Sequence, residues 1–572
     1  MLATLLLLSL ALASHAPAPA LSLPPRPPVR CAGDGAGCVL SNAYGAWSSD
    51  RDDCPVSAVV YPSSEQEVVA AVARAAAAGT RVKVVSGFAH TIPKLACPGG
   101  GNGTGSSTLL ISTARLAAVE VDAGARTVTA DAGAPLRAVI DAAEARGLSL
   151  VAAPYWEGVS VGGLVSTGSH GSSWWGRGGA VHDHVVGLRL VAPGEETDGW
   201  ARVLPLRRGD ELFPAALVSL GLLGVVTKIT LSLEPRFKRS ITYEYRDDSS
   251  IQDDFAAHAA RHEFADITWY PSQHTAVYRV DGRAPLNASG DGANDFIGFQ
   301  ATPIAVTAGL RALETSLERS RNAKGKARRS GSSAAGSRTT ATSSRGADAD
   351  VGLLRRSPAA DLLSACGWDP RFHGLFFYES TAFFSPASRF RDFALDVKRL
   401  RDAAGAEGLC GVDVYNGILV RFVRASAAHL GQPEDSVVVD FNYYRASDPA
   451  APRLGGDVWE EVEQLAFVKH GARPHWAKNR LVAFAGVRGK YPRWGQFEAA
   501  KRRLDPRGLF DSQWSDEVVG AEEVSKGDGC ALDGRCLCSE DRHCSPGQGY
   551  YCRPGLVFTE ARVCRYSVSQ NQ

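Results

Sequence analysis

The most informative stretch of this chain is Gly158-Val159-Ser160-Val161-Gly162-Gly163-Leu164-Val165-Ser166-Thr167-Gly168-Ser169-His170-Gly171. Five of these fourteen residues are glycine, and small or hydroxyl-bearing residues stand between them. Glycine lets a backbone approach a ligand closely, and serine and threonine hydroxyls add hydrogen-bond donors. The stretch is not a Walker loop, because no Gly-Lys-Ser/Thr follows, and it lacks the Gly-x-Gly-x-x-Gly dinucleotide pattern. It predicts a ligand-binding turn, with a tightly packed structural turn as the alternative.

Two further segments flank this stretch, within a region of alternating strands and helices over residues 55–235. In Val84-Val85-Ser86-Gly87-Phe88-Ala89-His90-Thr91 a strand runs into a glycine-containing turn, whose backbone N–H groups can cradle a diphosphate. Ser219-Leu220-Gly221-Leu222-Leu223-Gly224-Val225-Val226 leads into an expected strand over 225–233. The other elements that we expect here are strands near 58–61, 81–85, 127–130 and 187–191, a helix from the capping box Ser64/Glu67 to Gly79, and a helix over 135–146 that ends at Gly147.

The composition is that of a folded protein, with 62 basic and 61 acidic residues among 572. This balance argues against a general nucleic-acid binder, which would carry a basic excess. Residues 320–350 are a basic run followed by Ser, Gly, Ala and Thr, which predicts a disordered surface loop. The alternatives are a nucleic-acid patch, opposed by the absence of aromatic residues, and an error in the gene model. Folded patterning returns over 368–516, with strands expected at 376–379 and 437–444 and helices near 388–403 and 457–469.

The two ends of the chain indicate secretion. Residues 2–13 are apolar and uncharged, too short a run to span a bilayer, and are typical of a signal peptide, with an uncleaved anchor as the alternative. Six of the twelve cysteines lie in the last 43 residues, which predicts a disulfide framework there rather than a zinc site. Further bridges are expected near the N-terminus, from Cys31, Cys38 and Cys54. Sequons at Asn102 and Asn287 agree with secretion.

These glycine-rich segments resemble the flavin-binding domain of the vanillyl-alcohol-oxidase superfamily. Within it the chain is similar to the aldonolactone oxidases, especially the plant branch of gulonolactone oxidases, because Arg473-Pro474-His475-Trp476-Ala477-Lys478 resembles their Arg-Pro-His-Trp-x-Lys signature. Leu504-Asp505-Pro506-Arg507-Gly508-Leu509-Phe510 resembles their C-terminal Asp-Pro segment. The resemblance implies an α+β fold: a signal peptide (1–22), a two-subdomain PCMH-type FAD-binding domain (48–236), a mixed α+β substrate or cap domain including the 320–350 loop (237–516), and a disulfide-rich C-terminal tail (525–572).

The implied cofactor is FAD, and the family's covalent histidine corresponds to His90. The family's triple glycine is altered here to Gly87-Phe88-Ala89, so covalent and noncovalent binding both stay open. The residues that the resemblance places at FAD are Ser86, Gly87, Phe88, Ala89, His90, Thr91, Gly158, Ser160, Gly162, Gly163, Ser166, Thr167, Gly168, His170, Gly171, Gly224, Val226 and Lys478.

The implied catalytic residues are Arg421, His475 and Lys478. Family members hold substrate with a Glu-x-Arg pair, and this chain keeps Arg421 but carries Leu419 where the glutamate is expected. Lys478 would favour negative charge on the reduced flavin, and His475 is a candidate base. On one helical turn these two residues would face the same side. A metal site at His182 and His184 would need a third ligand, so no metal is predicted.

The resemblance implies FAD-dependent oxidation of L-gulono-1,4-lactone, or of a close aldonolactone such as D-arabinono-1,4-lactone, at C2. Oxygen or another acceptor would take the electrons, giving an ascorbate-type product and, with oxygen, hydrogen peroxide. The alternatives are a secreted flavoenzyme with another carbohydrate or plant metabolite as substrate, and a flavin-free wall or binding protein. No nucleic-acid partner is expected. The expected location is the secretory pathway and then the apoplast or vacuole, with weak membrane or wall association open.

Overall fold

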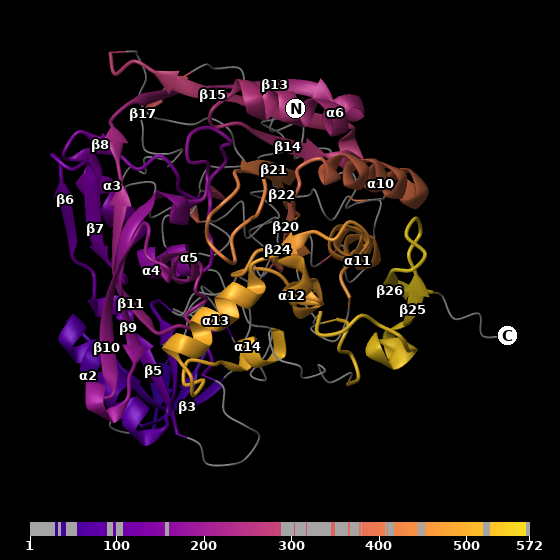
Figure 1. Cartoon of the computed structure of the whole chain (residues 1–572). Helices are drawn as coiled ribbons and strands as arrows, with labels where there is room; N and C mark the ends of the chain where they lie inside the picture. The colour runs from indigo at the N-terminus through magenta and orange to yellow at the C-terminus, as the bar shows by residue number, and fades with distance from the viewer. Residues whose placement is uncertain are drawn as a thin grey trace, which may run out of the picture.

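The computed structural model places three large β-sheets, of five, five and eight strands, and a small disulfide-rich module in one continuous chain (Figure 1). It describes residues 29–32, 36–41, 54–87, 95–98, 107–154, 159–287, 302–303, 316, 345–348, 364–365, 377–378, 380–405, 409, 417–441, 443–444, 452–518, 527–532 and 534–567. Within these ranges, no helix is long and apolar enough to cross a membrane.

The first sheet is mixed and ends at the predicted diphosphate turn. Its strands, in order across the sheet, are β1 (Val29–Cys31), β2 (Ala36–Leu40), β3 (Cys54–Val60), β5 (Thr108–Ser112) and β4 (Arg81–Val85). Both β3 and β4 run parallel to β5. Helix α2 (Glu65–Ala78) begins as expected, since the Ser64 hydroxyl accepts the Glu67 N–H, and it ends at Gly79 with φ +66°.

The second sheet is antiparallel and carries the glycine-rich stretch. Its strands are β10 (Ala201–Arg207), β9 (Val185–Pro193), β11 (Val225–Ser232), β7 (Thr127–Asp131) and β6 (Val119–Asp122), and its helices are α3 (Leu136–Glu144), α4 (Val161–Ser166) and α5 (Phe213–Leu217). Val68 and Val72 of α2 share one buried core with Ile111 of the first sheet and Val191 of the second. Helix α2 therefore joins the two sheets into one unit (Figure 1).

The third sheet has eight strands and helices on one face. Its order is β17 (Arg345–Asp348), β13 (Lys238–Asp247), β15 (Thr275–Ala284), β14 (Asp266–Tyr270), β21 (Ile418–Val423), β22 (Ser436–Asp440), β20 (Thr381–Phe384) and β24 (Arg473–Pro474). The helices that pack on it are α6 (Ile251–Arg261), α10 (Arg389–Ala404) and α11 (Gly456–Gln464). The expected helix over 457–469 changes to a π-helical turn at Leu465–Lys469.

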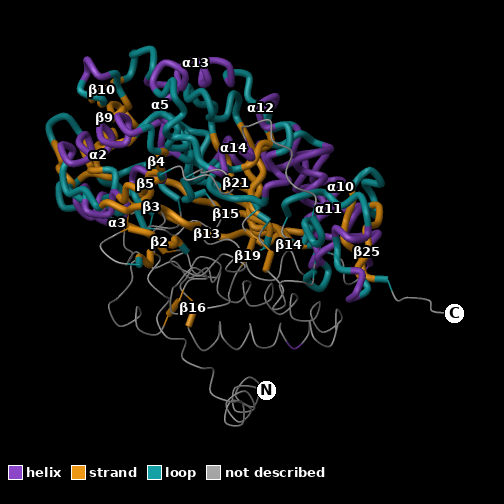
Figure 2. The backbone as a smooth tube through the Cα atoms, turned by 90° about the horizontal axis from the view of Figure 1, so that it is seen from below, coloured by secondary structure: helices purple, strands orange, loops and turns teal. Residues whose placement is uncertain are grey.

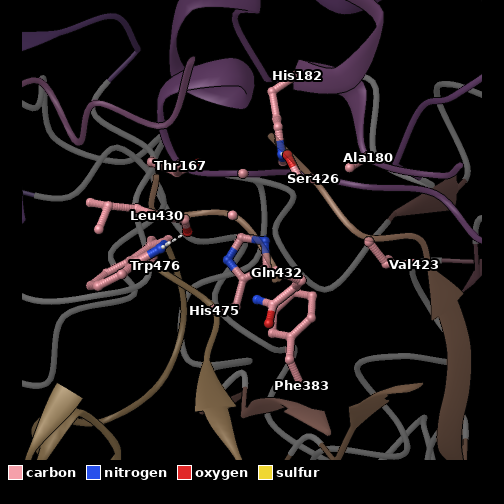
Figure 3. Close-up of a pocket in the computed structure, with 12 residues that line it drawn as sticks. Thr167, Ala180, His182, Phe383, Val423, Ser426, Leu430, Gln432, His475 and Trp476 are labelled. Carbon is pink, nitrogen blue, oxygen red and sulfur yellow. Dashed lines mark hydrogen bonds between the residues drawn. The ribbon is translucent and has the colours of Figure 1, made fainter. Parts of the chain in front are cut away.

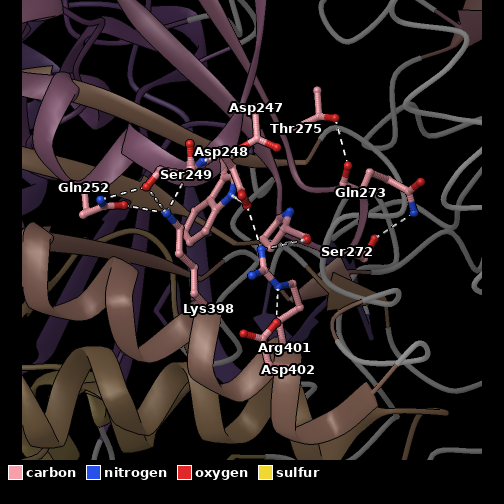
Figure 4. Close-up of polar contacts among 12 residues, drawn as sticks. Asp247, Asp248, Ser249, Gln252, Ser272, Gln273, Thr275, Lys398, Arg401 and Asp402 are labelled. Atoms are coloured by element: carbon pink, nitrogen blue, oxygen red, sulfur yellow. Dashed lines mark hydrogen bonds and ion pairs between the residues drawn. The ribbon is translucent and has the colours of Figure 1, made fainter.

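Strand alternation divides the residues of this sheet between two faces. Val420, Phe422 and Val439 share a core with the aromatic residues of α10, so they face the helices. Polar contacts connect α10 to α6 and to the turn before it: Arg401 binds the Asp248 carboxylate of the turn at 2.9 Å, and Lys398 contacts the Gln252 amide of α6 (Figure 4). On β21 and β22, the residues that alternate with Val420, Phe422 and Val439 point to the opposite face, toward the first two sheets. Arg421 is one of them.

The expected strand over 437–444 is interrupted. Strand β22 ends at Asp440, and β23 (Tyr443–Tyr444) pairs instead with β19 (Phe377–Tyr378). The remaining elements are β8 (Leu148–Ser149), β12 (Glu234–Pro235), β16 (Thr302–Pro303), β18 (Ser364–Ala365), α12 (Val487–Lys490), α13 (Trp494–Leu504) and α14 (Gln513–Val518). Helix α13 contacts α5, so the chain returns from the third sheet to the first unit (Figure 2).

The tail is a disulfide-stapled module that packs on α11. Its hairpin is β25 (Tyr550–Pro554) and β26 (Arg562–Tyr566), and its bridges are Cys530–Cys536, Cys538–Cys552 and Cys544–Cys564. The buried Glu461 of α11 accepts three consecutive backbone N–H groups of the tail, at 2.6–2.8 Å. Cys31–Cys38 and Cys54–Cys97 are the N-terminal bridges. The α+β fold and the disulfide-rich tail expected from the sequence are confirmed.

Candidate active site

Arg421 lies in the middle of β21 and is nearly inaccessible to solvent. Its guanidinium forms an ion pair with Asp440 on the neighbouring strand β22. A second guanidinium nitrogen, Nη1, donates to the backbone carbonyl of His170 at 3.4 Å. Arg421 therefore joins the third sheet to the end of the glycine-rich stretch, as a buried cation at the boundary between the two units.

The glycine-rich stretch reaches Arg421 because it forms a short helix and then pairs with β21. Ser160 caps α4 by accepting the Gly163 N–H at 3.3 Å. Beyond the helix, the Ser173 N–H donates to the Phe422 carbonyl at 2.7 Å, and the Phe422 N–H donates to the Ser172 hydroxyl at 3.0 Å. These contacts fix His170 beside Arg421.

Two glycines of the stretch are required by packing within the protein. A Cβ on Gly162 would lie 2.9 Å from the Ala132 carbonyl oxygen, and one on Gly171 would lie 2.7 Å from that of Ala153. The packed-turn alternative therefore accounts for these two positions. Ser166 and Thr167 close α4, and Gly168 follows with φ +73°, a conformation that favours glycine.

Asp440 contacts both cations of the site, Arg421 and Lys478. Besides Arg421, its carboxylate contacts Lys478 Nζ at 3.3 Å and accepts a hydrogen bond from the Thr381 hydroxyl. Burial favours the protonated acid, but the charges of Arg421 and Lys478 act more strongly and hold the pKa of Asp440 well below its ordinary value. The carboxylate is therefore ionised across the working pH range.

His475 and Lys478 lie on a turn, and the helical turn expected for them is wrong. Residues 473–474 form β24, and the Lys478 N–H then donates to the His475 carbonyl at 3.2 Å. Asn479, with φ +77°, holds this turn by donating to the same carbonyl at 3.1 Å. Trp476 packs in the core, stacked on Tyr491 with ring centroids 5.0 Å apart, so its role is packing.

The two buried histidines of the site are held in different tautomers. Nδ1 of His475 accepts the Ala477 N–H at 3.1 Å, so the proton of the neutral ring is on Nε2. Nδ1 of His170 lies 2.8 Å from the Gly171 carbonyl and must donate to it, which leaves Nε2 with a free lone pair. Burial above all, with Arg421 near His170 and Lys478 near His475, keeps both pKa values well below 6.5.

A small pocket opens between these segments (Figure 3). It is lined by Thr167, Gly168, Ala180, His182, Phe383, Val423, Ser426, Leu430, Gly431, Gln432, His475 and Trp476. Figure 3 shows His475 between Phe383 and Trp476 on one side, with His182 and Ser426 opposite. The glycine-rich stretch and the His-Trp-x-Lys turn, about 300 residues apart in sequence, thus share one cavity.

The histidines considered for a metal have protein partners instead. Nε2 of His182 lies 3.0 Å from the Ser426 hydroxyl, and Nε2 of His184 lies 3.1 Å from the Gly178 carbonyl. In the described part of the chain, the grouped side chains that could ligate a metal are tail residues, five cysteines and His543, and the cysteines are in disulfides.

The remaining predicted FAD residues lie outside the pocket or outside the described residues. Ser86 and Gly87 follow β4, where the Ser86 hydroxyl contacts that of Thr113 at 2.6 Å. Gly224 directly precedes β11 and has φ +136°, and a Cβ there would lie 2.4 Å from the Val191 carbonyl oxygen, while Val226 lies on β11 itself. Phe88, Ala89, His90, Thr91 and Gly158 lie outside the described residues, so covalent attachment through His90 stays a prediction.

Three family models match successive parts of the chain. They are the FAD binding domain over 56–197, D-arabinono-1,4-lactone oxidase over 386–518, and the L-gulonolactone oxidase 2-like C-terminal domain over 527–566. L-gulonolactone oxidase 3 of Arabidopsis thaliana is 52% identical over 568 residues, which cover 96% of this chain and 95% of that protein. The chain belongs to the L-gulonolactone oxidase family.

More distant relatives agree with this family and with the fold. L-gulono-1,4-lactone dehydrogenase of Mycobacterium tuberculosis is 26% identical and covers 84% of this chain and 100% of that protein. A solvent-stable cholesterol oxidase of known structure superposes with a TM-score of 0.65 at 18% identity, covering 87% of this chain and 100% of that one. The cholesterol oxidase supports the fold, and the matched FAD-binding and lactone-oxidase domains, with the 52% identical relative, make this family member an FAD-dependent oxidoreductase.

The residues present fit the FAD that this family uses. Among the described residues, a Cβ on Gly87 would meet no atom within 4 Å, at the end of β4 where a diphosphate is expected. The Ser166 hydroxyl, which accepts from Ser219, lies at the end of α4, whereas the Thr167 hydroxyl already donates to the Gly163 carbonyl at 2.9 Å. Lys478 keeps 22% of its side chain exposed beside Arg421. Hydroxyl donors for a diphosphate and cations for a reduced flavin are the donor set that FAD requires.

Sequence reasoning located Arg421, His475, Lys478 and His170 but missed Asp440, Thr381 and Asn479. For Asp440 a signal was present: one acidic residue ends the apolar run Val437-Val438-Val439. A carboxylate at the end of a buried strand needs a cation, but only the pairing of β21 with β22 shows that this cation is Arg421. Thr381 and Asn479 act through contacts between distant segments and carry no local signal.

Proposed function

We propose that this protein oxidises L-gulono-1,4-lactone, or a close aldonolactone such as D-arabinono-1,4-lactone, at C2 and so serves ascorbate synthesis. C2 loses its hydrogen as hydride and its hydroxyl loses a proton, which gives a 2-keto lactone that tautomerises to the ascorbate-type product. FAD, when bound, supplies a two-electron acceptor that oxygen can reoxidise, with hydrogen peroxide as the second product.

The observation that carries this proposal is the buried group of Arg421, Asp440 and Lys478 beside the pocket. Two cations and one carboxylate give the group a net positive charge, because both neighbouring histidines are neutral. Such a site favours the negative charge that develops when a flavin is reduced, and its donors suit a hydroxyl-rich lactone. The names of the relatives supply the lactone as substrate class.

The base in this proposal is His170 rather than His475. A base needs a free lone pair, and the Nδ1 lone pair of His475 is taken by the Ala477 N–H while its Nε2 carries the proton. Nε2 of His170 keeps its lone pair, and Arg421 holds the backbone of that residue in place. His475, 5.7 Å from His170 between ring centroids, would then orient the substrate through its Nε2–H.

Oxygen uptake by the purified protein tests the proposed activity. L-gulono-1,4-lactone and D-arabinono-1,4-lactone should each start oxygen consumption with matching peroxide formation, and alditols and oligosaccharides should react at least about tenfold more slowly. Oxygen consumption that starts only with another class of carbohydrate would show that the substrate is not an aldonolactone. Protein that carries no flavin would refute the enzymatic account altogether.

We also propose that the protein enters the secretory pathway, is glycosylated and acts in the apoplast or vacuole, with weak membrane or wall association. Support comes from the apolar N-terminal run, from five disulfides and from Asn287, a sequon residue whose side chain is exposed. Expression in plant cells with a C-terminal tag tests this, through the N-terminal sequence and the mass lost on deglycosylation. An intact Met1 terminus with no mass loss would contradict it.

A further inference from the structure

A carboxylate is absent from β21 at the position where the family pattern has one, and the neighbouring strand supplies another. Leu419 stands two residues before Arg421, on the same face of the strand. The register of β21 and β22 places Asp440 directly opposite Leu419. Residues directly opposite in an antiparallel pair lie on one face, with Cβ atoms about 5 Å apart. Asp440 and Leu419 thus occupy adjacent places on the surface that carries Arg421.

The surroundings of Asp440 are built to hold a charged carboxylate. One oxygen pairs with the Arg421 guanidinium, and the other accepts from the Thr381 hydroxyl and lies 3.3 Å from Lys478 Nζ. Thr381, Asp440 and Leu419 form one row across β20, β22 and β21. Only 5% of Asp440 is exposed, so the two cations compensate the cost of burying it.

We propose that Asp440 replaces the carboxylate missing at position 419 and acts as the positioning residue for Arg421 and Lys478, in the lactone oxidation proposed above. Without it, two cations would face each other across the strand end with no anion between them, and each would move apart or lose its orientation. The single negative charge also sets the net charge beside the flavin. The carboxylate can therefore stand on either strand, β21 or β22, as long as its negative charge lies between the two cations.

A charge-relocation experiment tests this inference. Asp440→Asn removes the charge, and the double variant Leu419→Glu/Asp440→Asn returns it from the opposite strand. We expect Asp440→Asn to lower kcat/KM about 10- to 100-fold, chiefly through a raised KM, and the double variant to recover about tenfold of that loss. Loss of a negative charge beside two cations should also raise the reduction potential of the bound flavin, and the double variant should bring it back.

The matched control is Asp248→Asn. Asp248 is also a buried aspartate paired with an arginine, Arg401, but it lies on the helix-covered face of the same sheet (Figure 4). The Asp248→Asn variant should be less stable than the wild type, while its KM and the reduction potential of its flavin stay unchanged. Equal effects in both variants, or a loss in Asp440→Asn that the double variant does not recover, would overturn the inference.

Folding and substrate assignment are tested separately. If Asp440→Asn does not fold, Leu419→Glu/Asp440→Asn is compared with Leu419→Gln/Asp440→Asn, and the inference requires that only the glutamate variant folds with FAD bound. A wild-type protein that is inactive on every lactone would refute the proposed function. The potentials of the variants would still decide the role of Asp440, because they need no substrate.

Discussion

Buried charge is the main feature of the site at the scale of residues. Arg421, Asp440 and Lys478 form a compact group whose net charge is +1 while His170 and His475 stay neutral. Desolvation strengthens each of these interactions, because little water screens them. The group is therefore suited to stabilise an anion that forms only during the reaction, which is the condition for raising kcat.

Removing the Arg421 guanidinium should disable turnover more than it harms the fold. Arg421→Ala deletes the buried cation that we propose stabilises the reduced flavin, together with the contact with His170, so we expect kcat/KM to fall about 10²- to 10³-fold. Steady-state oxygen uptake measures this. Arg424→Ala, three residues on, removes an exposed arginine that binds the Gly176 carbonyl, and it should stay within about twofold of wild type. Similar losses in both variants would contradict the assignment.

The pH dependence of kcat/KM should report a histidine with a lowered pKa. Burial, with the charge of Arg421 next in size, keeps the pKa of His170 well below 6.5, so its neutral, proton-accepting form persists as the pH falls through 6.5. We expect a flat profile from neutral pH to below 6.5 and a loss of activity only at more acid pH. An acid limb centred at or above pH 6.5 would show that another group is the base.

What the sequence predicted at this scale depended on motifs. Arg421, His475 and Lys478 were found because they stand in a signature, while the tautomers of His170 and His475 depend on backbone groups that only the fold places. The base assignment to His475 changed for this reason. Asp440 needed the register of β21 and β22, which no local pattern contains.

At the scale of elements, the important step is the docking of the segment after α4 along β21. Backbone contacts of Ser173 with residues 422–423 make the segment after the glycine-rich stretch an extra partner of the third sheet. The caps of α2 and the presence of α3 and α10 were predictable from sequence, because they depend on neighbours three or four residues away. This docking was not predictable, since it joins segments about 250 residues apart.

The close approach of α4 to Ala132 should make Gly162 intolerant of a side chain. In Gly162→Ala the new Cβ would lie 2.8 Å from the Ala132 Cβ, so α4 must move and we expect a loss of about 1–3 kcal/mol with reduced FAD content. Urea unfolding and the flavin-to-protein absorbance ratio measure this. In Gly495→Ala, on α13, the Cβ meets nothing within 4 Å, so that variant should be neutral or slightly stabilised. Full FAD content in Gly162→Ala would refute this packing argument.

At the scale of the whole molecule, the tail is linked to the active site through the protein interior. Arg480 donates to the tail carbonyl of Ala531 at 3.3 Å and pairs with Glu463. The Ser380 hydroxyl lies between Glu463 and Asn479, and Asn479 holds the His475 carbonyl. The six tail cysteines were predictable as a disulfide module, but its attachment to α11 was not, because charged residues of α11 that a pattern would place on the surface are buried under it.

Glu461 should be the main anchor of the tail. Glu461→Ala leaves the N–H groups of Leu556, Val557 and Phe558 without their acceptor, and we expect a loss of about 3 kcal/mol with earlier proteolysis of residues 527–567. Thermal unfolding and limited proteolysis measure the two effects. Glu498→Ala removes a glutamate that has only arginine side chains at 3.4 and 3.9 Å and should change stability by less than about 0.5 kcal/mol. Equal losses would mean that Glu461 is not the anchor.

The most direct test of the whole account is anaerobic mixing of the purified protein with L-gulono-1,4-lactone. We expect a yellow protein whose flavin absorbance bleaches within one turnover and returns when oxygen is admitted, with bleaching strongly slowed in Arg421→Ala. A yellow protein that keeps its absorbance with every aldonolactone offered would contradict the proposed reaction and the role given to Arg421.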